Sequence, residues 1–119
     1  MKDFQRLKVW SKAHQLTLIL YKETKSFPKE ELFGLTSQIR RSASSIPANL
    51  AEGCGRDSEK ELARFIQIAQ GSAYELEYHL LLAYELEYLA KTRYIDLRSQ
   101  VLEVQRMLYS FRNKLVASC

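Results

Sequence analysis

Glycine and proline are scarce in this sequence, with four glycines and two prolines among 119 residues. These two residue types supply most tight turns, so their scarcity predicts few connections and long secondary-structure elements. Strand-like alternation of apolar and polar residues is also missing over any useful length, which leaves an all-α chain as the expectation. We expect one domain over residues 1–119, because the length suits a single hydrophobic core and no linker divides it.

The sequence also has few cysteines and no long apolar run. Cys54 and Cys119 are too few for a disulfide framework, which favours a cytoplasmic location of the bacterial type. No stretch of roughly 18 apolar residues is present, so we expect no membrane span. The opening residues Met1, Lys2 and Asp3 lead directly into a charged periodic segment, which argues against a secretion signal.

Apolar residues recur at spacings of three and four over four segments, which predicts four helices. We expect these helices at about residues 4–27, 29–53, 58–89 and 92–116. Pro28 ends the first helix, Gly53 and Gly55 end the second, and Ser58 caps the third. Connections this short place neighbouring helices antiparallel. The prediction is an antiparallel up-down-up-down four-helix bundle.

Each predicted helix buries an apolar stripe, and two helices have a second one. The expected core positions are Leu7, Trp10, His14, Thr17, Tyr21 and Thr24, with Val9, Ala13, Leu16, Leu20 and Phe27 beside them; Leu32, Leu35, Ile39, Ala43, Ile46 and Leu50; Leu62, Phe65, Ile66, Ala69, Ala73, Leu76, Leu80 and Ala83; and Tyr94, Leu97, Val101, Val104, Leu108, Phe111 and Leu115. On the third helix, a further stripe lies on another face and consists of Tyr74, Tyr78, Leu81 and Tyr88.

Two positions inside the helices predict special packing. Pro47 removes one backbone donor from the second helix and crowds the carbonyl of Ala43, so we expect a kink there. Gly71 and Ser72 lie in the middle of the third helix, where glycine costs roughly 1 kcal/mol in helix propensity. Such a site predicts a neighbouring helix that passes close by.

Residues that carry catalysis or bind metals do not converge in the sequence. His14 and His79 lie on different predicted helices, and neither has a second histidine or cysteine at helical spacing. Cys54 has no histidine nearby in the sequence to activate its thiol. Glu75 and Glu77 lack the Glu-x-x-His pattern of di-metal bundles. We therefore predict that the protein is not an enzyme and uses no metal or cofactor.

The net charge of +4 is unevenly distributed. Residues 1–64 hold twelve Lys/Arg and eight Asp/Glu, residues 65–90 hold four glutamates and no Lys/Arg, and residues 91–119 hold six Lys/Arg and two Asp/Glu. Segregated charge of this kind is compatible with binding nucleic acid, an acidic protein or copies of the same chain. It is equally compatible with an unevenly charged solvated surface, so charge alone leaves these alternatives open.

A polar stripe follows the second predicted helix at spacings of three and four, beside its core stripe. Its members are Gln38, Arg41, Ser45, Asn49, Glu52 and Arg56. Arginine suits phosphate groups, whereas Glu52 would repel them. An ordinary solvated face, a structural or subunit seam and a nucleic-acid site all remain possible, and the residues favour the seam.

Several motifs resemble one bacterial family. They are Leu7-Lys8-Val9-Trp10 with Lys12-Ala13, Phe27-Pro28 with Glu31, Gly34-Leu35 with Gln38-Ile39-Arg40-Arg41, Ser45-Ile46-Pro47-Ala48-Asn49-Leu50-Ala51-Glu52-Gly53 with Arg56, and Ala69-Gln70-Gly71-Ser72 with Glu75-Leu76. Over about residues 4–115 the chain resembles the four helix bundle protein family, also called the 23S rRNA intervening-sequence protein family. The resemblance implies a four-helix subunit of a ring-like homopentamer.

The same resemblance bears on function. Family members are often encoded within intervening sequences of ribosomal RNA genes. A related branch comprises the accessory proteins of diversity-generating retroelements, which are basic pentamers that bind reverse transcriptase and nucleic acid. This chain departs from that branch in its modest charge and its acidic third helix.

Two hypotheses about function follow. The first is a non-catalytic homo-oligomer that binds structured RNA, such as ribosomal RNA, through basic patches repeated by symmetry. This hypothesis predicts phosphate contacts at Arg40, Arg41, Arg56, Lys60 and Arg64. The polar residues Gln38, Ser45, Asn49 and Glu52 are predicted to form a seam that serves assembly, folding or binding. The alternative is an oligomeric scaffold for a protein partner with little affinity for nucleic acid, which the acidic segment 65–90 favours.

Overall fold

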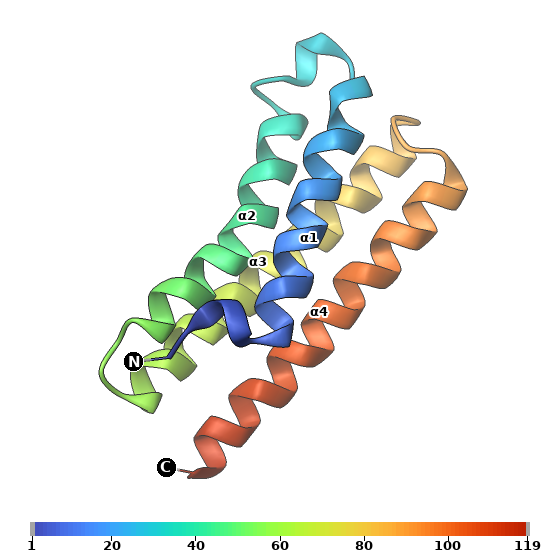
Figure 1. Cartoon of the computed structure of the whole chain (residues 1–119). Helices are drawn as coiled ribbons and strands as arrows, with labels where there is room; N and C mark the ends of the chain where they lie inside the picture. Colours follow the sequence, from blue (N-terminus) through green and yellow to red (C-terminus); the bar gives the residue numbers. More distant parts are fainter. Residues whose placement is uncertain (1, 119) are drawn as a thin grey trace.

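The computed structural model describes residues 2–118, which contain helices and no strand. The four α-helices are α1 (Lys8–Glu23), α2 (Leu35–Cys54), α3 (Glu59–Glu85) and α4 (Lys91–Ser118). Figure 1 shows them as an antiparallel up-down-up-down bundle, in which each helix lies beside the next along the chain. Contacts between α1 and α4 close the arrangement. The predicted all-α fold and four-helix bundle are confirmed.

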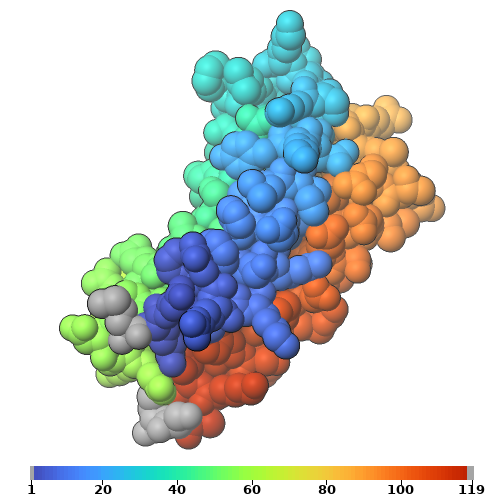
Figure 2. Space-filling view, in the orientation of Figure 1, coloured from blue at the N-terminus to red at the C-terminus, as the bar shows by residue number. Residues whose placement is uncertain are grey.

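The bundle is elongated, with extents of 45 × 23 × 20 Å. In the space-filling view, α1 lies between α2 and α4, and its side chains cover the front of the bundle (Figure 2). No helix within residues 2–118 combines the length and the apolar character needed to cross a lipid bilayer.

The helix ends differ from the predicted positions. The first predicted helix is α1 flanked by two 3₁₀-helices, η1 (Phe4–Arg6) and η2 (Thr24–Ser26). The extended backbone of Leu7 separates η1 from α1, whereas η2 continues directly from the end of α1. A third 3₁₀-helix, η3 (Lys29–Glu31), precedes α2, which begins at Leu35 instead of residue 29. The backbone of Gly34 (φ −114°, ψ −114°) lies outside the helical region and separates the two. Likewise, α3 ends at Glu85 instead of residue 89, and Glu87 adopts a left-handed φ of 67° in the turn that follows.

The core follows the predicted stripes closely. Its largest fully buried side chains are Leu16, Leu20, Ile39, Ile46, Leu50, Ile66, Leu76, Leu80, Leu97, Val101, Val104 and Leu108. Tyr21 and Leu32 were expected in the core but are 43% and 49% exposed. Leu32 precedes α2 and so is not on its inward face, while Tyr21 lies at the edge of an apolar surface wider than one helix contact. His14 is half-buried and stacks on Trp10 with ring centroids 4.8 Å apart.

The two special positions inside the helices behave differently. α2 continues through Pro47, which is buried, and the expected kink stays a prediction. The expectation of a neighbouring helix close to Gly71 and Ser72 holds at Ser72, whose hydroxyl lies 2.9 Å from that of Ser45 on α2, but not at Gly71, where a Cβ would meet no atom within 4 Å. Gly71 faces solvent, and Ser72 is the residue that faces α2. The close approach is instead at Gly53, where a Cβ would lie 2.8 Å from the Cβ of Phe65.

Candidate nucleic-acid interface

The five basic residues predicted to contact RNA do not form one patch. Arg40 and Arg41 lie near the start of α2, whereas Arg56 follows its end, sixteen residues later. At 1.5 Å per residue this separation is about 24 Å along the helix axis. Lys60 and Arg64 lie in the first two turns of α3. The structure therefore divides the predicted set between two ends of the bundle.

Arg40 is held against the end of α1. Its Nε donates to Oγ1 of Thr24 over 2.9 Å, and its Nη2 donates to the carbonyl oxygen of Tyr21 over 3.2 Å. The guanidinium carbon also lies 4.8 Å from the centroid of the Tyr21 ring. A cation at this position complements the negative end of the α1 dipole. In the single chain, Arg40 joins α1 to α2.

The polar stripe lies where α2 contacts α3. Arg41 forms an ion pair with Glu75 of α3 and donates from Nη2 to Oε1 of Gln38 over 2.9 Å. The Nε2 of His79 lies 3.2 Å from the same Glu75 carboxylate. Glu75 thus links a histidine on its own helix to an arginine on α2.

The part of the polar stripe toward the C-terminal end of α2 also makes hydrogen bonds and ion pairs within the chain. Ser72 donates to Oγ of Ser45 over 2.9 Å, and Asn49 donates from Nδ2 to the Ser45 carbonyl oxygen over 2.7 Å. Arg56 pairs with Glu52 at 2.8 Å, and its guanidinium lies 4.9 Å from the centroid of the Phe65 ring. The stripe is therefore a seam between two helices of the same chain, although Arg41 and Arg56 remain about half exposed.

A basic groove opens between the beginning of α3 and the end of α4. It has a volume of about 370 Å³, and its lining includes Lys60, Arg64, Gln67 and Arg112. Ser58 caps α3 by accepting from the backbone N–H of Glu61 over 3.1 Å, which places Lys60 and Arg64 one turn apart on the same face. Glu61 lies 3.9 Å from Arg64, at the limit of an ion pair.

Arg112 completes the basic groove, and the sequence prediction missed it. Among the described residues, no group accepts a hydrogen bond from its buried Nε atom. A signal was present, since Arg98, Gln105 and Arg112 recur every seven residues along α4, outside the core seam. Only the antiparallel packing of α4 on α3 shows that Arg112 lies beside Lys60 and Arg64.

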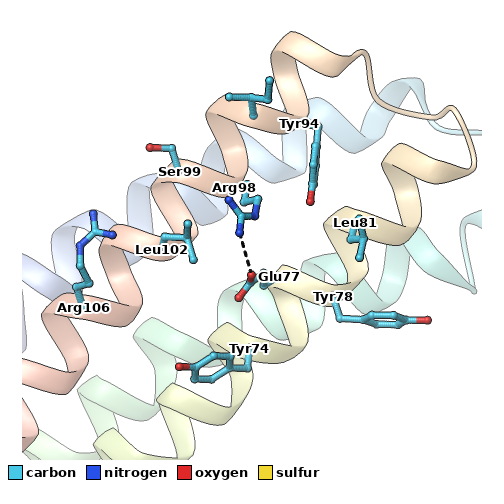
Figure 3. Close-up of a pocket in the computed structure, with 10 residues that line it drawn as sticks. Tyr74, Glu77, Tyr78, Leu81, Tyr94, Arg98, Ser99, Leu102 and Arg106 are labelled. Carbon is cyan, nitrogen blue, oxygen red and sulfur yellow. Dashed lines mark ion pairs between the residues drawn. The ribbon is translucent and has the colours of Figure 1, made fainter.

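A larger hollow, the tyrosine groove, lies farther along the same two helices (Figure 3). Its volume is about 840 Å³, and it is lined by Tyr74, Glu77, Tyr78, Leu81, Tyr94, Ile95, Arg98, Ser99, Leu102 and Arg106. Figure 3 shows Glu77 and Arg98 facing each other across the groove, with 3.9 Å between their charged atoms. Glu77 also accepts a hydrogen bond from Gln105 over 2.8 Å. Tyr74 and Tyr78 are 63% and 57% exposed.

The acidic segment of the sequence is partly neutralised within the chain. Glu75 pairs with Arg41, and Glu77 pairs with Arg98. Glu85 and Glu87 are exposed at the opposite end of α3 from the basic groove. Within residues 65–90, the acidic groups outside these two ion pairs therefore lie at the α3–α4 turn.

The described residues include no group of three or more His, Cys, Asp or Glu side chains placed to hold a metal ion. Cys54 is a buried free thiol, and burial raises its pKa. Cys119, the second cysteine of the sequence, lies outside the described residues.

Comparison with known proteins assigns the chain to a family. The model of the family described as 23S rRNA-intervening sequence protein matches residues 5–110. The chain belongs to this family. The resemblance inferred from the sequence motifs is thus confirmed, and Arg112 lies just beyond the matched range.

A solved relative supports the same fold. It is a crystal structure from Bacteroides thetaiotaomicron, described as a protein with unknown function from the S23 ribosomal protein family. It aligns with a TM-score of 0.82 and 27% sequence identity, over 88% of this chain and 95% of that chain. No curated protein matches the sequence.

Proposed function

We propose that this member of the 23S rRNA-intervening sequence protein family is a non-catalytic, cytoplasmic homo-oligomer that binds structured RNA, such as ribosomal RNA. One observation carries the proposal: Lys60, Arg64 and Arg112 line a single open groove. Arginine guanidinium groups donate paired hydrogen bonds to phosphate, and lysine adds a compact positive charge. The family name, which refers to 23S rRNA, supports RNA as the anion.

Repetition around an oligomer supplies the affinity in this proposal. One groove with three cations meets few phosphates and binds weakly, whereas several grooves on one ring bind the same RNA together. We propose a homopentamer, as the family resemblance implies. Large apolar side chains left exposed on a single chain support self-association, among them Leu18 (47% exposed), Leu32 (49%) and Phe33 (94%).

The other arginines predicted to contact RNA, Arg40, Arg41 and Arg56, contribute less to phosphate binding than the basic groove does. Arg40, Arg41 and Arg56 already contact groups of their own chain, so binding a phosphate requires each to give up or share a partner. Arg41 and Arg56 are partly exposed and can add rim contacts, whereas the basic groove provides the principal site.

The test is binding of ribosomal RNA fragments at increasing salt concentration, with matched charge variants. The variant Lys60→Ala/Arg64→Ala/Arg112→Ala removes the three positive charges of the basic groove. The control variant Lys22→Ala/Lys25→Ala/Lys29→Ala removes three positive charges from exposed positions near the end of α1 and in the turn that follows. The proposal expects steeply salt-dependent binding that the first variant loses and the second largely keeps. Binding that is independent of salt, or equal losses in both variants, would contradict it. Light scattering after nuclease and high-salt treatment tests the pentamer.

A second candidate function is a scaffold for an acidic protein segment. A groove of about 410 Å³ between α1 and α4 includes Leu7, Met107 and Phe111 in its lining, together with Lys8 and Arg106, and no acidic residue lines it. An amphipathic acidic helix suits such a surface. A discrete protein that copurifies after nuclease treatment, and is lost in Met107→Asp, would favour the scaffold over the RNA-binding proposal.

A further inference from the structure

We infer that the α3–α4 face is a track for an unpaired stretch of RNA, whose phosphates contact the basic groove and whose bases stack on exposed tyrosines. The inference rests on the proposed function and names the form of RNA that the protein takes. Within a structured RNA, unpaired stretches are loops, bulges and ends.

The track consists of three hollows in succession along α3 and α4. The basic groove is the first. A middle hollow of about 390 Å³ follows, lined by Gln70, Tyr74, Gln105, Arg106, Tyr109 and Ser110. The tyrosine groove is the third, and it shares Tyr74 and Arg106 with the middle hollow. From Lys60 to Leu81 the track spans about 32 Å at 1.5 Å per helical residue.

The charge of the track complements a nucleic-acid strand. Five cationic side chains line the three hollows, namely Lys60, Arg64, Arg98, Arg106 and Arg112, against two acidic ones, Glu61 and Glu77. Glu77 already accepts from Gln105 and faces Arg98, which reduces its repulsion of phosphate. Cations therefore occur at both ends and in the middle of the track, as a continuous backbone requires.

The aromatic side chains provide stacking surfaces beside these cations. Tyr74 and Tyr78 lie one turn apart on α3, and Tyr109 lies on α4 beside the middle hollow; they are 63%, 57% and 62% exposed. Tyr94 is fixed by stacking on Tyr84, with centroids 4.6 Å apart. Aromatic rings between basic side chains are typical of surfaces that bind single strands, because every base presents a flat face to stack on.

The same surface does not suit a duplex. Paired bases hide their faces within the helical stack, so double-stranded RNA is recognised by its shape through phosphates and 2′-hydroxyl groups. Exposed tyrosines gain little from such a ligand. The amide side chains of Gln67 and Gln70 also line the track and can hydrogen-bond base edges, which only unpaired nucleotides present freely.

The experiment compares fluorescence anisotropy of labelled oligoadenosine with that of the same strand annealed to oligouridine. The test variant is Tyr74→Ala/Tyr109→Ala, and the conservative variant is Tyr74→Phe/Tyr109→Phe, which keeps both aromatic rings. We expect the wild type to prefer the single strand. Each tyrosine-to-alanine change should weaken that binding roughly 5- to 160-fold, while the phenylalanine variant keeps it.

Three outcomes would overturn the inference. Equal affinity for duplex and single strand, unchanged in the alanine variant, rejects the track but leaves the proposed RNA-binding function in place. A change in oligomeric mass of the alanine variant without a change in affinity shows that a second copy covers this face. If the wild type binds neither form of RNA at low salt, the proposed function itself fails and the track fails with it. Circular dichroism of each variant establishes that its helices remain folded.

Discussion

The side-chain oxygen of Thr17, on α1, lies 3.2 Å from the backbone carbonyl oxygen of Ala43, on α2. This carbonyl is the one that Pro47, which has no N–H, leaves without its helical donor. The Thr17 hydroxyl also lies 2.8 Å from the carbonyl oxygen of Ala13, so its single proton is shared between the two acceptors. All four residues are buried. A neighbouring helix therefore provides the hydrogen bond that proline removes from α2.

Replacing the Thr17 hydroxyl should destabilise the protein. In Thr17→Val the carbonyl of Ala43 stays buried without a donor, which costs about 1–3 kcal/mol. Thr17→Ser keeps the hydroxyl and should retain most of the stability. Urea unfolding of the three proteins measures the difference. Coupling to Pro47 provides the specific check: Pro47→Ala restores an N–H, so Thr17→Val should cost less in that background. Additive losses would contradict the shared role.

Two glycines in the helices should respond oppositely to alanine. At Gly53 a Cβ would lie 2.8 Å from the Cβ of Phe65 and 2.9 Å from Cδ1 of Leu62, so Gly53→Ala should destabilise the protein by about 1–3 kcal/mol. At Gly71 a Cβ meets nothing within 4 Å, so Gly71→Ala should stabilise by about 0.4–1 kcal/mol. Thermal unfolding of both variants checks the pair. A destabilised Gly71→Ala protein would show that another chain approaches this position.

Glu31 should make stability depend on acid pH. Its carboxylate accepts from the backbone N–H of Leu35 over 3.0 Å and from the Tyr88 hydroxyl over 2.9 Å. These two bonds, the first being the stronger influence, lower the pKa of Glu31 from its ordinary value of 4.5. The same contact raises the pKa of Tyr88.

Because the folded pKa lies below the unfolded one, the stabilisation is fully present above about pH 4.5 and is lost as pH falls through the folded value. Glu31→Gln should therefore be less stable than the wild type at neutral pH, and this difference should shrink below pH 4.5. Urea unfolding across this pH range measures it. Glu30→Gln, at an exposed neighbouring position, serves as the control for removing one negative charge from this turn.

Cys54 should be unreactive in the folded protein. Its side chain is 2% exposed, and burial raises its pKa, so little thiolate is present or accessible. In a Cys119→Ser variant, which leaves one thiol, a disulfide reagent should modify Cys54 only as fast as the protein opens. Full reactivity in denaturant is the control. Modification of the native protein at the rate of a free thiol would contradict the burial of Cys54.

The fold was predictable because helix periodicity and burial are local properties of the sequence. The positions of the helix ends were harder to predict than the fold. The structure begins α2 at Leu35, where the Glu31 carboxylate accepts the backbone N–H, and that carboxylate is held by Tyr88, 57 residues farther along the chain. No pattern within residues 29–35 contains this information.

The candidate interface was predictable only in part for the same reason. Lys60 and Arg64 share one face of α3 and could be found from their spacing. Arg112 joins them only through the packing of α4, and Arg41 is drawn away by Glu75 on another helix. Tertiary partners, which a single helix cannot reveal, decide which arginines remain available for a ligand.

The order of the helices in the bundle also has a kinetic consequence. Four pairs of neighbouring helices pack against each other in the bundle. Three of these pairs are consecutive in the chain, whereas the fourth pairs α1 with α4 and has the smallest interface. A topology dominated by local contacts folds quickly, in the microsecond to millisecond range for helical bundles. Contact between α1 and α4 joins the two helices that are farthest apart in the sequence, so we expect this interface to form last during folding. In native-state hydrogen exchange, α1 should correspondingly open before the α2–α3 hairpin.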